Sequence, residues 1–152
     1  MTALTLEKLS VGYGSRPALR DVDLEVRSGE CVLLAGPSGS GKSTLVRCLN
    51  RLIPQCLPGQ VSGRLLLDGR PIQDAAVAEL SRSIGVVFQN PRTQLLNVRV
   101  EDEVAFGPRN LGLAEDEVER RVNGALAAVG LTALRSRTTH ALSDGERQRL
   151  AI

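Results

Sequence analysis

The chain has 152 residues, a length typical of one globular domain. Its hydrophobic content of 42% excludes a disordered chain, and its net charge of +2 is spread through the sequence without a basic stripe. We therefore expect no nucleic-acid partner. The apolar runs are too short to span a bilayer, the first residues show no secretory signal, and an odd set of three cysteines fits a reduced intracellular protein.

The residues before the first glycine-rich segment are predicted to form strands separated by turns. Apolar and polar residues partly alternate over residues 4–9, residues 11–15 resemble a turn, and residues 22–27 alternate strictly. Residues 31–35 form a continuous apolar run, as expected of a central strand covered on both faces. A glycine-rich loop over 36–41 then precedes a helix over about 42–53, which Pro54 is expected to end.

The second half is predicted to change from strands to helices. Residues 63–70 indicate a strand with a hairpin turn at Asp68 and Gly69, residues 77–80 a short helix, and residues 84–88 another apolar strand. An apolar face and an acidic first turn predict a helix over 115–129, with Gly130 as its C-terminal cap. A last helix begins within residues 142–146 and is expected to continue through Ile152.

Residues 36–43 match the pattern G-x-x-x-x-G-K-[ST] of a phosphate-binding loop, placed between an apolar segment and a helix. Glycines let successive backbone N–H groups point at an anion, and the helix start adds the positive end of its dipole. Lys42 is expected to reach the β- and γ-phosphates, and the hydroxyl of Ser43 to bind Mg²⁺. The pattern alone leaves kinases, GTPases, transport ATPases and repair ATPases open. The expected nucleotide-binding residues of this loop are Gly36, Pro37, Ser38, Gly39, Ser40, Gly41, Lys42, Ser43 and Thr44.

Three further motifs distinguish among these classes. The sequence Leu-Ser-Asp-Gly-Glu at residues 142–146 resembles the signature motif of ATP-binding cassette (ABC) ATPases. Gln89, which follows an apolar run, resembles the Q-loop glutamine of that family, and Tyr13 resembles its A-loop aromatic residue. Residues 88–95 and 104–112 are similar to the ATPase subunits of energy-coupling factor transporters, which import vitamins and cobalt or nickel ions.

The resemblance implies an α/β fold with a P-loop NTPase core, an N-terminal antiparallel β part and a helical subdomain. Residues 1–152 would be a single nucleotide-binding domain, with the core and β part over about 1–91 and the helical subdomain over about 92–152. It also implies ATP and Mg²⁺ as ligands. The implied partners are a transmembrane transporter subunit and a second ABC ATPase subunit, identical or different, and the implied location is the cytoplasm, on the inner face of the cell membrane.

The resemblance assigns roles to four residues outside the loop. Tyr13 would stack its ring on adenine, and Gln89 would contact Mg²⁺ or the attacking water through its amide oxygen while sensing the membrane partner. Ser143 would be the N-cap of the last helix and would also donate a hydrogen bond to the γ-phosphate of ATP held by the partner ATPase subunit. Gly145 would allow its backbone N–H to approach the same phosphate closely.

Two signature residues depart from the family pattern, which usually has Gly where Asp144 stands and Gln where Glu146 stands. A carboxylate beside an incoming triphosphate is electrostatically unfavourable. Asp144 is therefore expected either to point away from the phosphate or to weaken the contact between subunits.

Hydrolysis in the family requires an apolar strand that ends in Asp, followed by the Glu that polarises the attacking water. No such run occurs after Gln89 in this sequence, so we expect a domain truncated at its C-terminus with an incomplete core sheet. The predicted function is the ATP-binding subunit of a transporter that imports a small solute, a vitamin or a metal ion. The alternatives are an ATP-binding fragment without hydrolysis and a different P-loop enzyme such as a kinase, so whether this chain is an enzyme stays open.

Overall fold

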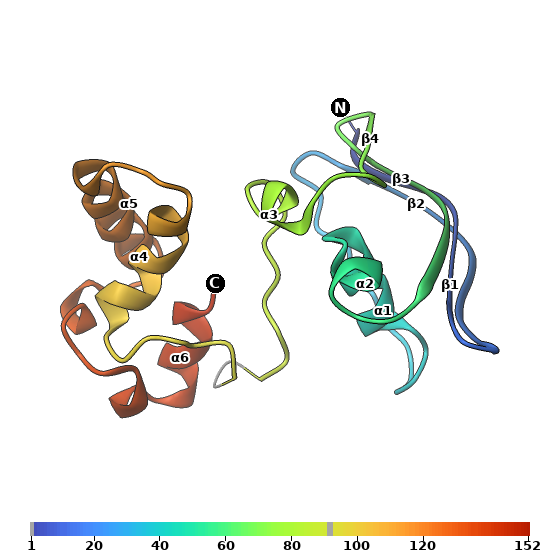
Figure 1. Ribbon diagram of the computed structural model, residues 1–152. Helices are drawn as coiled ribbons and strands as arrows, with labels where there is room; N and C mark the ends of the chain where they lie inside the picture. Colours follow the sequence, from blue (N-terminus) through green and yellow to red (C-terminus); the bar gives the residue numbers. More distant parts are fainter. Residues whose placement is uncertain (1, 91–92) are drawn as a thin grey trace. The chain divides into compact units, whose positions relative to one another are not determined.

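The computed structural model describes residues 2–90 and 93–152, which form two compact units, Met1–Val86 and Val87–Ile152 (Figure 1). The strands and helices of the first unit are β1 (Thr2–Tyr13), β2 (Arg16–Arg27), α1 (Lys42–Leu49), α2 (Leu52–Gln55), β3 (Gln60–Leu67), β4 (Arg70–Pro71) and α3 (Val77–Leu80). The helices of the second unit are α4 (Val100–Asn110), α5 (Glu115–Ala128), the 3₁₀ helices η2 (Thr132–Leu134) and η3 (Thr139–Ala141), and α6 (Asp144–Leu150).

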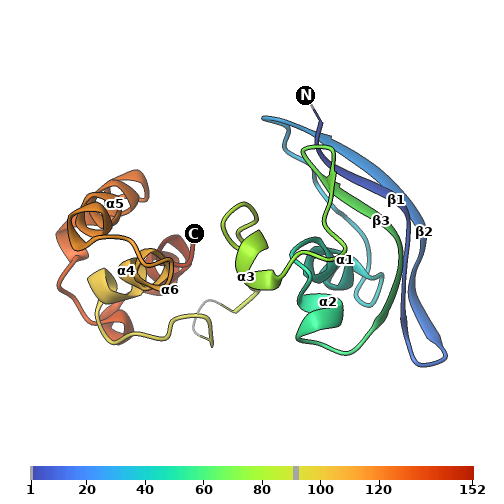
Figure 2. The same ribbon diagram turned by 45° about the horizontal axis from the view of Figure 1, so that its top comes forward.

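The sheet of the first unit is antiparallel, with the strand order β2-β1-β3-β4. On β1, Leu6 pairs with Leu24 of β2 and with Leu65 of β3. The predicted hairpin turn at residues 68–69 joins β3 to β4. The sheet curves around α1 and α2, which lie on its concave side (Figure 2). The buried core between them contains Leu6, Leu9, Val11, Leu45, Cys48, Ile53, Leu65, Ile72 and Leu80.

Two apolar segments that were predicted as strands, residues 31–35 and 84–88, are not strands. Leu33 in the first segment is 88% exposed, and Phe88 in the second is 41% exposed. The backbone N–H and C=O groups of a strand need a neighbouring strand to bond with. No strand among the described residues pairs with either segment. The prediction was wrong because apolar side chains do not by themselves supply that neighbour.

The helix after the glycine-rich loop is shorter than predicted. α1 ends at Leu49, and Arg51 has a left-handed backbone with φ of 60° before α2 begins. The side-chain Oδ1 of Asn50 accepts a hydrogen bond from Leu52 N at 3.2 Å. Asparagine side chains compete in this way with helical backbone bonds, so the helix ends before Pro54, which lies inside α2.

The helices of the second unit enclose a separate apolar core. Gly130 has a φ of 67° and follows α5, and Leu131 N donates to Leu126 O at 2.8 Å, which confirms the predicted C-terminal cap. α6 ends at Leu150 instead of continuing through Ile152. The buried residues of this core are Val100, Ala105, Val118, Val122, Leu126, Leu131, Leu142 and Leu150.

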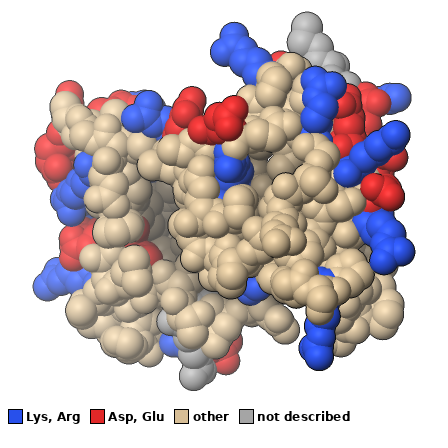
Figure 3. All heavy atoms as spheres, turned by 45° about the vertical axis from the view of Figure 1, so that its right-hand side comes forward, with Lys and Arg blue, Asp and Glu red and all other residues tan. Residues whose placement is uncertain are grey.

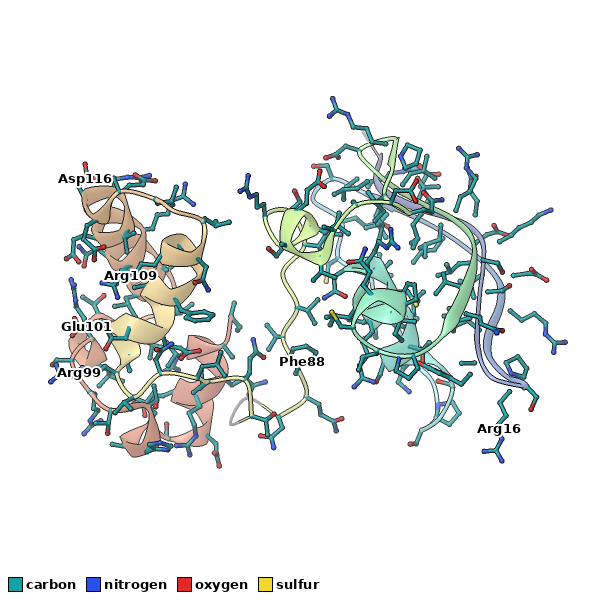
Figure 4. The ribbon with its side chains drawn as sticks, viewed as in Figure 1. Arg16, Phe88, Arg99, Glu101, Arg109 and Asp116 are labelled. Atoms are coloured by element: carbon teal, nitrogen blue, oxygen red, sulfur yellow. The ribbon has the colours of Figure 1, made fainter. Side chains whose placement is uncertain are left out.

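The surface of the second unit carries ion pairs that join its helices. The Arg135 guanidinium donates to Glu101 of α4 at 2.9 Å and to Glu119 and Asn123 of α5 at 2.6 and 2.8 Å. The hydrogen bond from Arg135 lowers the pKa of the Glu119 carboxyl. Figure 4 labels Arg99 beside Glu101, with 3.6 Å between Arg99 Nη1 and Glu101 Oε1. Solvent screens exposed pairs of this kind, so they support the packing of α4 on α5 without dominating it.

Charged side chains of both signs lie interspersed on the face shown in Figure 3. Within the described part of that face, no area is covered by lysine and arginine alone. Among the helices of the described residues, none combines the length and the apolar character that crossing a bilayer requires.

Candidate functional site

The glycine-rich loop curls because two of its glycines adopt backbone conformations that other residues avoid. Gly39 and Gly41 have φ of 80° and 93°, in the left-handed region. A Cβ atom at Gly41 would lie 2.6 Å from Leu19 Cδ2 and 2.7 Å from the carbonyl oxygen of Ala18. The loop therefore passes so close to β2 that only glycine fits at Gly41.

Lys42 places a positive charge across this loop. Its Nζ donates hydrogen bonds to the carbonyl oxygens of Gly36 at 2.8 Å and Pro37 at 2.7 Å, and to Ser40 Oγ at 3.3 Å. All three acceptors belong to the loop itself. The ammonium group is therefore held within the curl, where an anion bound by the loop would meet it.

The first turn of α1 offers backbone donors beside this charge. α1 has no side-chain N-cap, and its first backbone bond runs from Leu45 N to Gly41 O at 2.9 Å. The N–H groups of Lys42, Ser43 and Thr44 precede that bond and have no partner within the helix. Their donors, together with the helix dipole and the Lys42 ammonium, form an arrangement that suits a phosphate group.

Tyr13 lies next to the same helical turn. Its hydroxyl is 3.3 Å from Thr44 Oγ1, within hydrogen-bond distance, and its side chain is partly exposed. Tyr13 ends β1 and pairs with Arg16, which Figure 4 labels at the end of the hairpin. The structure thus brings the predicted A-loop aromatic residue and the predicted phosphate loop together, with part of the ring open for stacking.

The residues near the loop also fit a magnesium ion that arrives with a triphosphate. Mg²⁺ usually takes one or two oxygens from the protein and the rest from phosphates and water. Ser43, in the first turn of α1, offers one hydroxyl of this kind. Among the residues that the structure describes, no three His, Cys, Asp or Glu side chains gather into a metal-binding group of their own.

Gln89 lies in the second unit, on an exposed segment before α4. Figure 4 shows its neighbour Phe88 on this extended stretch, and Phe88 N donates to Gln94 Oε1 at 3.0 Å. Gln94 Nε2 in turn lies 3.4 Å from the carbonyl oxygen of Ala151, its acceptor. The side-chain amide of Gln94 therefore bonds the backbone just before Gln89 through its oxygen and the end of α6 through its nitrogen.

Two residues that the sequence analysis missed hold residues 95–98 in place. Glu103 Oε2 accepts hydrogen bonds from Leu96 N at 2.9 Å and Asn97 N at 2.6 Å, and Thr139 N donates to Val98 O at 2.8 Å. The acidic start of α4 was the available signal, but it indicates a helix dipole partner equally well. Next to this segment is a cavity of about 340 Å³, lined by Leu95, Leu96, Asn97, Val98, Thr139, His140 and Arg147.

Ser143 caps α6 as predicted, and Glu146 completes a capping box with it. Glu146 N donates to Ser143 Oγ at 3.3 Å, while Ser143 N and Ser143 Oγ donate to Glu146 Oε2 at 2.7 and 2.8 Å. These hydrogen bonds, first from the backbone and then from the hydroxyl of Ser143, lower the pKa of the Glu146 carboxyl. A Cβ at Gly145 would meet nothing within 4 Å, so space is open beside its backbone.

Asp144 is paired with a cation on its own helix. Arg147 Nη2 donates to Asp144 Oδ1 at 2.8 Å, and Arg147 Nη1 donates to the carbonyl oxygen of His140 at 3.3 Å. Arg147 is largely buried, whereas the Asp144 side chain is largely exposed. The sequence analysis missed this pair, although a spacing of three residues on a helix is a known signal for one.

The phosphate loop and Tyr13 thus lie in the first unit, and Gln89, Ser143 and Gly145 lie in the second. Comparison with known families decides what this arrangement belongs to. The family model described as ABC transporter matches residues 19–152, which is most of the chain. The chain belongs to the ABC transporter family. The ABC-type α/β fold with a P-loop NTPase core that the sequence predicted is thereby confirmed.

The names of individual relatives are consistent with membership of the ABC transporter family. A protein of Methanosarcina acetivorans, provisionally named ABC transporter ATP-binding protein, is 51% identical over 97% of this chain, which covers 24% of that protein. A protein of Pyrococcus abyssi with the same provisional name is 46% identical over the whole chain, which covers 55% of it. A Bacillus subtilis protein, provisionally named HMP/thiamine import ATP-binding protein, is 41% identical over 98% of the chain.

One solved structure shows the same fold over nearly the whole chain. It is cbiO1 from Clostridium perfringens, described as part of the ABC transporter complex cbiONQ. The TM-score is 0.86 at 37% identity, and the match covers 99% of this chain and 59% of that one. The chain therefore spans between about a quarter and somewhat more than half of the relatives compared.

Proposed function

We propose that this chain binds ATP with Mg²⁺ and acts as the ATP-binding subunit of an ABC transporter that imports a small solute, a vitamin or a metal ion. One observation supports the proposal most strongly. The Lys42 ammonium is bonded to carbonyl oxygens of the glycine-rich loop, beside the start of α1, which no side chain caps. A nucleoside triphosphate supplies the anion that this arrangement is built to accept.

The predicted site residues of the first unit each contribute to holding the nucleotide. The backbone donors of residues 36–44 hold the phosphates, and Lys42 moves from its loop carbonyls to the β- and γ-phosphate oxygens. Ser43 provides a hydroxyl to Mg²⁺, and Tyr13 stacks on adenine from the end of β1. A bound Mg²⁺ would supply positive charge that offsets the charge of the triphosphate.

The second unit provides contacts with the other subunits and with Mg²⁺ or the attacking water. Gln89 offers its amide oxygen to Mg²⁺ or to the attacking water, and Ser143 and Gly145 face the γ-phosphate of ATP held by a second ABC ATPase subunit. A transmembrane subunit contacts residues 95–98, where Leu96 and Val98 are 69% and 63% exposed beside the 340 Å³ cavity. That contact holds the protein on the inner face of the membrane.

A role in solute transport is supported by two of the relatives. One is provisionally named for HMP/thiamine import, and the other belongs to the cbiONQ transporter complex. Within residues 1–152 we assign the binding steps rather than water activation, because no Asp-Glu pair follows an apolar run after Gln89.

Binding of MgATP to the purified protein tests the proposal, with Lys42→Ala as the matched control. We expect saturable binding in the wild type and a loss of at least about tenfold in affinity in the variant, because a charged hydrogen-bonding group is removed. Equal binding by both proteins would contradict the proposed site. Transfer of the γ-phosphate to a small-molecule acceptor would instead support the kinase alternative, and co-purification of a membrane subunit with the tagged full-length protein would exclude it.

A further inference from the structure

The hydroxyl and backbone N–H of Ser143 are both occupied in the structure. They donate to the same carboxylate oxygen, Oε2 of Glu146, at 2.8 and 2.7 Å. A bond of this kind to a charged acceptor is stronger than one between neutral groups. One donor that the proposed function assigns to an incoming phosphate, the Ser143 hydroxyl, is therefore already bound to an anion that belongs to the same helix.

We propose that Glu146 is an internal competitor of the γ-phosphate, which it excludes from Ser143 until the partner's ATP displaces it. The inference rests on the proposed function and concerns its regulation. Closure of the two ATPase subunits then involves an exchange, in which Ser143 releases one anionic acceptor and binds another. Glu146 lowers the affinity of the ATP-driven dimer by the free energy of the bonds that must be broken and by its repulsion of the phosphate.

The negative charge of Glu146 is what makes it a competitor. A capping box forms equally with Glu or Gln, so the fold of this turn does not require a carboxylate. A Gln side chain at this position would accept the same bonds through a neutral oxygen, which holds Ser143 less strongly and does not repel phosphate. The carboxylate therefore affects how readily a phosphate replaces it at Ser143, whereas the cap itself would also form with Gln.

Asp144 provides an internal comparison within the same turn. Its carboxylate Oδ1 accepts a hydrogen bond from Arg147 at 2.8 Å, so a cation compensates its charge. Glu146 instead binds the Ser143 donors, and the charges of Arg137 and Arg149 act on its carboxyl more weakly than these hydrogen bonds do. Neutralising either residue changes the net charge of the turn by the same amount, but only the change at Glu146 removes an anion from Ser143.

The test compares Glu146→Gln with Asp144→Asn in the full-length protein. Analytical ultracentrifugation measures ATP-driven dimerisation, and thermal unfolding without nucleotide measures the stability of the cap. We expect Glu146→Gln to tighten the dimer about tenfold, because the charged competitor at Ser143 becomes a neutral one. The Tm at neutral pH should fall only slightly, because a Gln side chain keeps the capping box but accepts weaker hydrogen bonds than the carboxylate. Asp144→Asn should tighten it by no more than about threefold.

Other outcomes would overturn the inference in distinguishable ways. Equal dimer affinity of the wild type and Glu146→Gln, or equal effects of the two variants, would show that Glu146 is only a cap residue. A fall in Tm of Glu146→Gln without a gain in dimer affinity would show the same. If ATP binds the wild type but drives no dimer in any variant, the proposed role of Ser143 fails, and the inference fails with it.

Discussion

The first turns of α1 and α6 both contain backbone N–H groups that lack partners within the helix, and the two turns differ in how these donors are satisfied. The N-cap residue of α1 is Gly41, which has no side chain, so no side chain caps the backbone donors of this helix. The N-cap residue of α6 is Ser143, and its capping box with Glu146 satisfies donors of the turn internally. Both turns are assigned to phosphate in the proposed function, yet one is open to a ligand and the other is already bonded.

The two contacts therefore differ in the bonds that must break before a phosphate can bind. At α1 an incoming phosphate meets unpaired backbone donors, and Lys42 has only to exchange neutral carbonyl oxygens for phosphate oxygens. At Ser143 a phosphate has to displace a carboxylate. Binding within one subunit is therefore intrinsically easier than closure between subunits, and the following variants test the contrast.

The largest effect is expected from Gly41→Ala, which removes the open turn of α1. The new Cβ would overlap Leu19 and the Ala18 carbonyl in a left-handed backbone, so the loop must shift. We expect ATP affinity to fall by about tenfold or more, corresponding to a strain of about 1–3 kcal/mol. Isothermal titration calorimetry measures this affinity.

Gly39→Ala is the matched control for that change. Gly39 also has a left-handed backbone, with φ of 80°, but a Cβ there would meet nothing within 4 Å. Its loss of affinity should be smaller, because strain acts without overlap. An equal loss in the two variants would show that close packing on β2 is not what shapes the loop.

A smaller effect is expected from Ser143→Ala, which removes the cap of α6. The Ser143 hydroxyl accepts from Glu146 N and donates to the Glu146 carboxylate, and both bonds disappear in the variant. We expect a loss of about 1 kcal/mol in the free energy of unfolding, measured by urea titration without nucleotide. Ser143→Thr, which keeps a hydroxyl, should retain most of the stability, and a Thr variant as unstable as Ala would contradict the cap.

Asp144→Gly should have a weaker effect in the opposite direction. It removes a carboxylate beside the proposed phosphate contact and releases Arg147 from its ion pair. We expect ATP-driven dimerisation to tighten by about threefold, as for an exposed charge pair, with ATP binding to the single subunit unaltered. Unchanged dimerisation, measured by sedimentation, would show that the carboxylate does not act on that contact.

The smallest effect is the pH dependence that Glu146 adds to stability. Hydrogen bonds from Ser143 lower the pKa of its carboxyl in the folded protein. The stabilisation is therefore complete above the unfolded-state pKa and is lost as the pH falls through the lower, folded-state pKa. Urea midpoints measured from neutral to acidic pH should fall less steeply in Glu146→Gln than in the wild type. Identical slopes would remove Glu146 from the acid transition.

The features that the sequence predicted correctly depend on neighbours along the chain. The hairpin turn at Asp68, the cap at Gly130 and the cap at Ser143 each follow from a few adjacent residues, and the structure contains all three. The glycine-rich loop that precedes α1 was likewise predicted from adjacent residues. Local chemistry is therefore enough to specify these features.

The failures have a different physical origin. Residues 31–35 and 84–88 have the composition of strands, but a strand exists only with a partner, and none is present among the described residues. The contacts of Glu103 with Leu96 and Asn97 depend on the path of the chain before α4, which periodicity does not reveal. Side-chain partners of this kind become visible only in three dimensions.

The unpaired state of residues 31–35 has a consequence for the entropy of nucleotide binding. This segment leads directly into the phosphate loop, which is anchored in regular secondary structure only at its α1 end. Fixing the backbone of each residue costs about 1–2 kcal/mol. Any chain segment that pairs with residues 31–35 would reduce the ordering cost of ATP binding without touching the nucleotide. The affinity of the phosphate loop for ATP therefore also depends on whether another chain segment pairs with residues 31–35.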